Sequence, residues 1–450
     1  MLLPFLVAPS LFGQVAWQGI GPYLPADTAS TFTLIRNKVE EATSTWEGEV
    51  PPSYLQVFER RSAALIEGVL DEEFYFEPSA TAYLEGILLE VAAANGIEFS
   101  PLLLIERSPT VNAYSMGHGL FVVTTGLLAN MPRRDQLVFI LAHELAHDQL
   151  DHLGDKLAQL PPIPEDAQSE RDKRAARRAQ RKELKERGQF AMMKDQRDQL
   201  YNARRFNRAN ELEADSMAAV YLQQTKYDVL RAADALANLN PGVAFNITRE
   251  QTVSALTSAG YPLQEHWLRA KATMFGGSFG KKETEEAEEE YFWAADSLRT
   301  HPDIDLRLAR LGLDSALARN GASAVDHPLA TLAQREQMAL YDAAELPIHT
   351  ICLAIPYLDK PEDPNYLIAQ AFVARSLDRI GRSIPEHNYA KMVPPAAHFE
   401  AEGAHLLVEM TQRMNAGDLR QLALALAEDA KREFPDSSIF TALLLELRAD

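Results

Sequence analysis

The segment HELAH at residues 143–147 constrains this chain more than any other, because it lies in a run, Leu137–Leu153, whose apolar pattern predicts a helix. Histidines four positions apart share one helix face, so His143 and His147 can both reach one metal ion. Glu144, beside the first histidine, can then accept a proton from water at that metal. Taken alone, the pattern also fits two solvated histidines, so a third ligand has to be found.

The candidate third ligand lies in the run ELEAD at residues 211–215, on a second helix expected over 207–224. Glu211 and Asp215 are one helical turn apart, so one carboxylate can bind the metal while the other orients a ligand histidine. Glu213 points elsewhere by helical phase. The alternative is an ordinary acidic helix face. Two imidazoles and one carboxylate, with a fourth position open, favour zinc among the divalent metals.

HELAH followed by ELEAD resembles the HExxH…ExxxD signature of peptidase family M48, a family of zinc metallopeptidases. Upstream, NAYS at 112–115 and GLFVVTTGLL at 119–128 are similar to a stretch that precedes HExxH in the family. Downstream, THP at 300–302 with Arg307 is similar to the family's THP…R motif. The four motifs occur in the expected order, and the resemblance covers about residues 50–315.

The resemblance implies a role for each matching residue. His143, His147 and Glu211 resemble the ligands of one Zn²⁺ ion, and Glu144 resembles the general base and acid. Asp215 matches the residue that holds a ligand histidine through its second ring nitrogen.

Three further roles come from the same resemblance. His301 matches a histidine that, in periplasmic members, can occupy or guard the fourth metal position, where it would also assist catalysis. Arg307 is expected to fix the helix that carries His301. The 90 positions between Glu211 and His301 exceed the spacing in compact members, because residues 231–300 look enlarged. Asn112 and Ala113 are expected on the edge strand to which an extended substrate adds.

The pattern along the chain favours an α+β, mostly helical fold. Short apolar runs over 102–105, 111–115 and 120–124, separated by glycines, predict a small antiparallel sheet. The expected organisation is a gluzincin-type metallopeptidase domain and an all-α region that loosely resembles tetratricopeptide helices. The metallopeptidase domain is expected over 28–318, and it begins with helices over 28–46, 53–70 and 77–95. It contains a charged helical insertion at 165–208 and a flexible insertion at 231–300. The all-α region is expected over 325–450.

The remaining histidines have no partner spacing and are expected to be structural. His152 follows His147 on the same predicted helix, and a solvated helix end is the favoured interpretation, with a place behind the ligand as the alternative. Cys352 lies in an apolar run and is expected to be a small buried hydrophobe. As the single cysteine, it excludes an intramolecular disulfide and a cysteine-built zinc site.

Charge is unevenly distributed. The 450 residues include 44 Lys and Arg against 64 Asp and Glu, a net charge of −20 that argues against a nucleic-acid partner. Residues 171–208 nevertheless carry +9, which leaves −29 for the rest. This basic block is interpreted as a solvated helical arm. The alternative is a lid or docking arm that meets acidic partners, an anionic membrane surface or the acidic run at 283–290.

Location is suggested by the apolar start of the chain. Residues 1–16 resemble the core of a secretory signal, although they lack a basic beginning. The expectation is a periplasmic or otherwise exported protein; the alternative is a cytoplasmic protein whose apolar N-terminus packs on the fold. No run reaches the roughly 18–20 apolar residues of a membrane-spanning helix. The prenyl-protease members, which carry such helices, are therefore a poorer match.

The function that these features imply is a zinc-dependent endopeptidase, in which Glu144 assists the attack of metal-bound water on a peptide bond. Resemblance to the soluble periplasmic β-barrel assembly-enhancing proteases suggests protein quality control in the bacterial cell envelope, with misfolded envelope proteins as substrates. The alternative is a chaperone-like or binding scaffold whose metal site is latent or capped. An intermediate possibility is a protease that stays latent until His301 moves.

Overall fold

The computed structural model describes residues 20–44, 52–154, 208–229, 231–239, 245–268, 304–313 and 327–449. The chain divides into two compact units. The N-terminal unit comprises Gly21–Ala244 and Lys271–Gln337, and the C-terminal unit comprises Phe245–Ala270 and Met338–Asp450 with Met1–Ile20. The predictions for the signal segment at 1–16, the basic block at 171–207, the acidic run at 283–290 and His301 lie outside the described residues.

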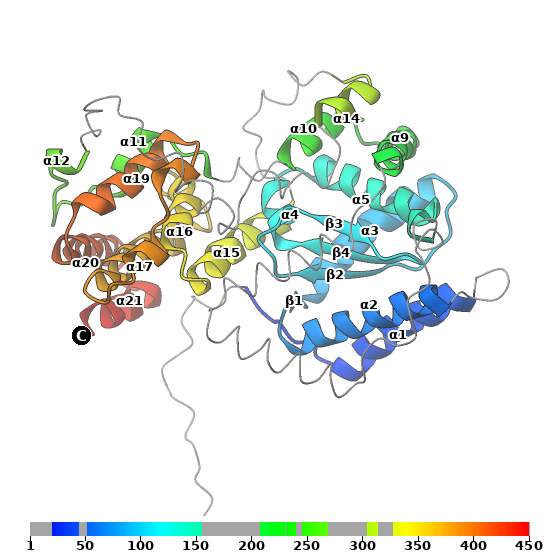
Figure 1. Ribbon diagram of the computed structural model, residues 1–450, viewed down its shortest axis with the longest axis horizontal. Coiled ribbons are helices and arrows are strands. Elements are labelled where there is room, and N and C mark those ends of the chain that lie inside the picture. The colour runs from blue at the N-terminus through cyan, green and yellow to red at the C-terminus, as the bar shows by residue number, and fades with distance from the viewer. Residues whose placement is uncertain are drawn as a thin grey trace, which may run out of the picture. The chain divides into compact units, whose positions relative to one another are not determined.

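A small sheet forms the centre of the N-terminal unit, with helices on both faces (Figure 1). Its strand order is β1-β2-β4-β3, and the edge strand β3 is joined to β4 by a tight turn. The described helices and this sheet confirm a mostly helical α+β fold. The strands are β1 (Phe74–Tyr75), β2 (Leu102–Glu106), β3 (Ala113–Ser115) and β4 (Leu120–Thr124).

The expectation of an antiparallel sheet was wrong for one strand pair. β2 and β4 run parallel, with Leu102 opposite Leu120, whereas β3 and β4 are antiparallel. The chain leaves β2, forms β3 at the outer edge and returns as β4 between them. All five residues of β4 are buried, which suits a central strand covered on both faces.

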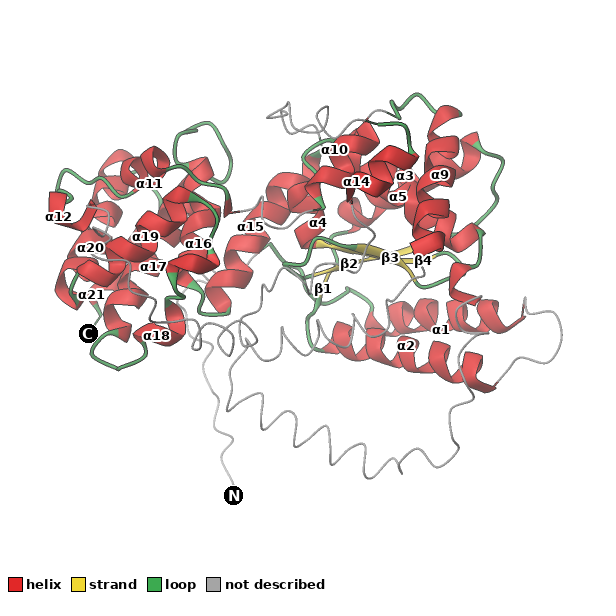
Figure 2. Ribbon diagram, turned by 45° about the horizontal axis from the view of Figure 1, so that its top comes forward, coloured by secondary structure: helices red, strands yellow, loops and turns green. Residues whose placement is uncertain are grey.

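The two faces of the sheet are covered by different helices (Figure 2). On one face, Ile35 of α1 (Thr28–Ser44) and Leu65 of α2 (Pro52–Leu70) share a core with Val122 of β4. On the other face lie α3 (Pro78–Ala94) and α5 (Arg134–Gln149), which contact the sheet and each other. α5 is buried from Gln136 to His147 without interruption, as expected for a helix at the centre of a domain.

Three further helices complete the region that holds the histidines. α9 and α10 both contact α5, and α14 contacts α9 and α10. A short helix, α4, follows β4 directly, and its first turn is capped by the Thr124 hydroxyl, which accepts from Leu127 N. The bounds are α4 (Thr125–Asn130), α9 (Arg208–Gln223), α10 (Arg231–Asn238) and α14 (Ile304–Arg310).

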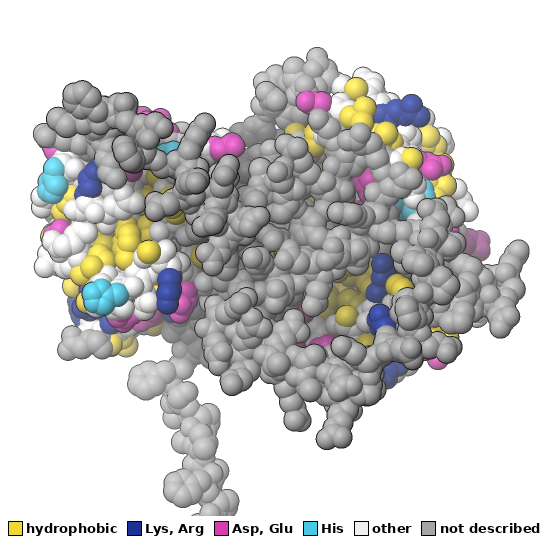
Figure 3. Space-filling view, viewed as in Figure 1, with side chains coloured by type: hydrophobic (Ala, Val, Ile, Leu, Met, Phe, Trp, Pro, Cys, Tyr) yellow, Lys and Arg dark blue, Asp and Glu magenta, His cyan; other side chains and the backbone are white. Residues whose placement is uncertain are grey.

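The described part of the C-terminal unit is helical, and it includes residues that the sequence analysis assigned to the metallopeptidase domain. Ile247 and Trp267 belong to the same core as Phe372 and Leu407. Figure 3 shows hydrophobic side chains gathered between charged ones over these helices. The helices are α11 (Arg249–Ala255), α12 (Glu265–Leu268), α16 (Pro347–Ala354), α17 (Tyr366–Ser383), α18 (Tyr389–Met392), α19 (Glu402–Arg413), α20 (Ala416–Glu433) and α21 (Ser438–Arg448).

The boundary between the units falls within α15 (Pro328–Ala343), whose residues up to Gln337 belong to the N-terminal unit. Gln337 donates to the Thr125 hydroxyl at 3.0 Å, and Glu336 accepts from Arg107 Nε at 2.7 Å. In the part of the chain that the structure describes, no helix is both long enough and apolar enough to cross a membrane.

Candidate metal centre

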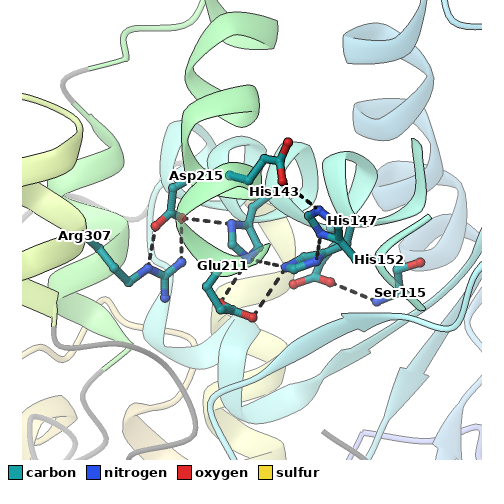
Figure 4. A network of polar contacts seen from close by, with 9 residues as sticks. Ser115, His143, His147, His152, Glu211, Asp215 and Arg307 are labelled. Carbon is teal, nitrogen blue, oxygen red and sulfur yellow. Dashed lines mark hydrogen bonds and ion pairs between the residues drawn. The ribbon is translucent and has the colours of Figure 1, made fainter. Parts of the chain in front are cut away.

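Three buried side chains converge where α5 and α9 pack together (Figure 4). His143 Nε2 and His147 Nε2 lie 3.1 Å apart, and oxygens of Glu211 lie 3.6 Å from the first and 3.5 Å from the second. Zinc bound tetrahedrally, with bonds of roughly 2.0–2.1 Å, separates its ligand atoms by about 3.3 Å. The three groups are therefore spaced as the ligands of one metal ion are.

Electrostatics at this cluster favour a cation. Burial opposes a positive charge on His143, but contacts with Asp215 and Glu211 outweigh it and raise the pKa of His143 to about 10. The nearby Arg307 acts against this rise. The cluster thus attracts positive charge, which a proton or a metal ion can supply.

Behind His143 lies a buried ion pair. His143 Nδ1 is 2.9 Å from Asp215 Oδ1, and Arg307 donates from Nε and Nη2 to the two Asp215 oxygens at 2.7 and 2.6 Å. Burial alone would raise the pKa of Asp215, but Arg307 and His143 lower it to about 2. Asp215 is therefore ionised and can hold a proton on Nδ1 of His143, which leaves Nε2 to face the metal position.

Behind His147 lies a second histidine. His152 Nδ1 is 2.8 Å from His147 Nδ1, and His152 Nε2 is 3.5 Å from Glu213 Oε2. His152 is 3% exposed, so the expectation of a solvated helix end was wrong. Glu213 points to a different side of its helix from Glu211 and Asp215, as predicted, and contacts His152 rather than the metal ligands. The sequence gives no clear signal for this contact, because a spacing of five residues on a continuous helix would turn His152 away from His147.

Glu144 is held by the sheet. One of its carboxylate oxygens accepts the backbone N–H of Ser115 at 2.9 Å, so β3 and the carboxylate lie side by side. The role of Ser115 cannot be predicted from the sequence, because a backbone donor leaves no signal in residue type. This contact fixes the carboxylate of Glu144, the residue after the ligand His143, at the backbone of β3.

Asp148, the residue after His147, anchors the turn between β3 and β4. It accepts from the Gly119 N–H at 3.0 Å and from the Ser115 hydroxyl at 3.2 Å. Burial raises the pKa of Asp148, and these two hydrogen bonds partly offset the rise. The turn, with His118 at φ +53° between two glycines, is thereby attached to the helix that carries the histidines.

The two predicted substrate-binding residues occupy different positions on the edge. Asn112 faces β4, because its carbonyl accepts from Thr124 N at 3.0 Å. Hydrogen-bonding directions alternate along a strand, so the backbone groups of Ala113 and Ser115 face away from the sheet. Ala113 therefore offers a position where a further strand can add. His301, the remaining predicted residue, lies outside the described chain.

Comparison with known proteins agrees with this geometry. The chain matches Peptidase family M48 over residues 78–313. It is also 37% identical over 59 residues to the mitochondrial metalloendopeptidase OMA1 of Bos taurus, a segment covering 13% of this chain and 11% of that protein. The chain thus spans only about a tenth of this relative. The family match, by contrast, covers more than half of the chain and includes every residue of the cluster, and the chain belongs to peptidase family M48.

Proposed function

We propose that the chain is a zinc-dependent endopeptidase that hydrolyses internal peptide bonds. The observation that carries this proposal is the buried convergence of His143, His147 and Glu211, with the carboxylate of Glu144 beside them. The ligand set is complete, and both ligand histidines contact a further side chain through their second ring nitrogen, Asp215 for His143 and His152 for His147. Such support favours a working peptidase over a scaffold with a disused metal site.

The chemistry divides between the metal and the chain. When bound, zinc supplies a Lewis acid that polarises the scissile carbonyl and lowers the pKa of a water molecule. Glu144 takes the proton of the attacking water and passes it to the leaving amine. The Ser115 N–H fixes one oxygen of Glu144, so the base keeps its orientation during both transfers.

The edge strand β3 positions the substrate. An extended peptide that pairs with the outward-facing groups of Ala113 extends the sheet by one strand next to Glu144. Main-chain pairing of this kind selects extended or unfolded segments rather than a particular side chain. This supports misfolded proteins as the substrate class, and we propose a role in quality control of the cell envelope after export, consistent with the apolar residues 1–16.

The test is Glu144→Gln. The variant is expected to bind one zinc ion per chain, as measured by metal analysis, and to lose about 10²–10⁴-fold of its casein hydrolysis. Glu85→Gln is the matched control, because Glu85 also accepts a backbone N–H of the sheet, from Leu103, away from the metal centre. The control should cleave like wild type, and undiminished cleavage by Glu144→Gln would exclude this mechanism.

A further inference from the structure

We propose that His152 and Glu213 act as positioning residues for the metal ligand His147. The three residues form a chain, here called the His152 relay, that sets the tautomer and the ring orientation of His147. The proposal rests on the proposed zinc site, and it assigns a role to two residues outside the ligand set.

The His152 relay consists of one hydrogen bond between the two histidines and a longer polar contact of 3.5 Å from His152 to Glu213. Both Nδ1 atoms lie 2.8 Å apart, and the two rings meet edge to face with centroids 4.9 Å apart. His152 is buried, whereas the Glu213 side chain is 60% exposed. The relay therefore runs from the metal position outward to a carboxylate at the surface.

Proton placement along the relay follows from the first contact. For Nε2 of His147 to bind a metal, the ring proton of His147 has to sit on Nδ1. Two nitrogens 2.8 Å apart need one donor and one acceptor, so Nδ1 of His152 accepts. The proton of His152 is then on Nε2, the atom that faces Glu213. Nδ1 of His147 thus donates to Nδ1 of His152, and Nε2 of His152 carries a proton toward the Glu213 carboxylate.

The fold brings His152 back by breaking the helix. On a continued helix, position 152 would lie about 140° around the axis from His147 and point away from it. Instead α5 ends at Gln149, and Asp151 adopts a left-handed conformation with φ +48°. The Asp151 side chain then accepts from Gly154 N at 3.0 Å, and residues 152–154 start a new helical turn. This break turns the imidazole of His152 toward His147.

The two ligand histidines are consequently supported in different ways. His143 is backed by the buried Asp215–Arg307 pair, whereas His147 is backed by the imidazole of His152, whose other nitrogen faces Glu213. Asp215 and Glu213 both lie on α9. This helix therefore supplies the ligand Glu211 and also residues that orient both ligand histidines.

The experiment measures zinc affinity of the full chain by competition with a chromogenic chelator. His152→Leu keeps the bulk of the side chain and removes the acceptor, and it should weaken zinc binding about 10–100-fold. His152→Asn places an amide oxygen near the position of Nδ1 and should recover most of that loss. In the cobalt-substituted protein, His152→Leu should also change the visible spectrum, which reports ligand geometry.

One control and a second test variant separate positioning from packing. His327→Leu removes another buried histidine of the N-terminal unit, one bonded to the Met131 carbonyl, and should leave zinc affinity unchanged. Glu213→Ala alters an exposed side chain, so it should fold even if His152→Leu does not. It should weaken zinc binding several-fold, and Glu213→Gln, which keeps an oxygen acceptor, should weaken it less.

The outcomes discriminate clearly. Zinc affinity within about twofold of wild type in a folded His152→Leu would overturn the proposal, as would a loss that His152→Asn does not recover. If His152→Leu does not fold, unchanged affinity in Glu213→Ala overturns it. A wild-type chain that binds no zinc would overturn the proposed function as well, whereas zinc binding with unaffected variants overturns the His152 relay alone.

Discussion

At the scale of single residues, buried charges in this protein are placed where a partner neutralises them. Asp215 is fully buried, yet Arg307 and His143 both contact it, and its pKa falls to about 2. Removing one partner of a buried ion pair leaves the other charge buried and unpaired. This loss destabilises a protein far more than the intact pair stabilises it. Arg307 therefore has a structural reason for its place on α14, in addition to orienting the ligand through Asp215.

His349 in the C-terminal unit is the opposite case, a buried group without a compensating charge. Its ring stacks on Tyr341 and meets Phe245 and Phe399 at centroid distances of 5.2 and 5.1 Å. Burial, together with the charge of nearby His398, lowers the pKa of His349 to about 3. His349 is therefore neutral in the folded protein and takes up a proton only on unfolding or in strong acid.

This shift predicts how stability depends on pH. The contribution of neutral His349 is fully present above the ordinary pKa of 6.5 and is lost as the pH falls toward 3. At pH 5 the free energy of unfolding should be about 2 kcal/mol lower on this account than at pH 7. His349→Phe should remove this pH dependence, because phenylalanine binds no proton in the unfolded chain.

The measurement is urea unfolding at pH 7 and pH 5, followed by fluorescence of Trp267, which is buried in the same unit. Trp17, Trp46 and Trp293 are replaced by Phe so that one fluorophore reports. His327→Phe, in the other unit, should leave the pH dependence of this transition as in wild type. Equal pH dependence in His349→Phe and wild type would contradict the prediction.

At the scale of secondary-structure elements, the local pattern predicted most of what forms. The helices expected over 28–46, 53–70 and 77–95 form within a few residues of those limits, and so do the strands β2, β3 and β4. Strand β1 has only two residues, which are too few to show the alternation of apolar and polar side chains that predicts a strand. The break at Asp151 was missed because the residues around it fit a helix, so the place of His152 was missed with it.

Long-range pairing explains the other differences. The parallel pairing of β2 with β4 depends on where the intervening strand goes, which no local pattern records. Residues 245–268 join the C-terminal core through Ile247 and Trp267, although their sequence resembles an insertion in the preceding domain. The ligand set was predictable because helical spacing and a family signature fix it, whereas its supporting contacts come from tertiary packing.

The first turns of α15 should stabilise the N-terminal unit, although they follow the end of the family match at residue 313. Glu336 is fully buried and accepts from Arg107 and from the hydroxyl of Tyr23. Glu336→Ala leaves these half-buried donors without that acceptor and should lower the free energy of unfolding by about 1–3 kcal/mol.

Calorimetry of the zinc-loaded full chain checks this expectation. The affected transition should be the one that responds to zinc, because the metal ligands lie in the same unit as Glu336. Leu332→Ala, at an exposed position of the same helix, is the control and should have little effect. An effect of Glu336→Ala on the other transition alone would show that α15 supports only the C-terminal unit.

At the scale of the whole molecule, each unit has a core of its own. Ile35, Leu65 and Val122 lie in one core, and Phe372 and Leu407 lie in another. All the described groups of the metal centre belong to the first unit. In the described part of the chain, stability is therefore shared between two units with separate cores, and only one of these units holds the metal ligands.

This division predicts two thermal transitions with different responses to zinc. Zinc binds the folded N-terminal unit, so free zinc at 1,000 times its Kd should stabilise that unit by about 4 kcal/mol. The transition of the C-terminal unit should keep its midpoint, and a chelator should lower only the zinc-linked one. Scanning calorimetry with and without zinc tests this, and His349→Phe, which alters the C-terminal core, identifies the zinc-independent transition. A single transition that shifts as a whole would instead mean that the two cores unfold together, with α15, shared by both units, as the element that couples them.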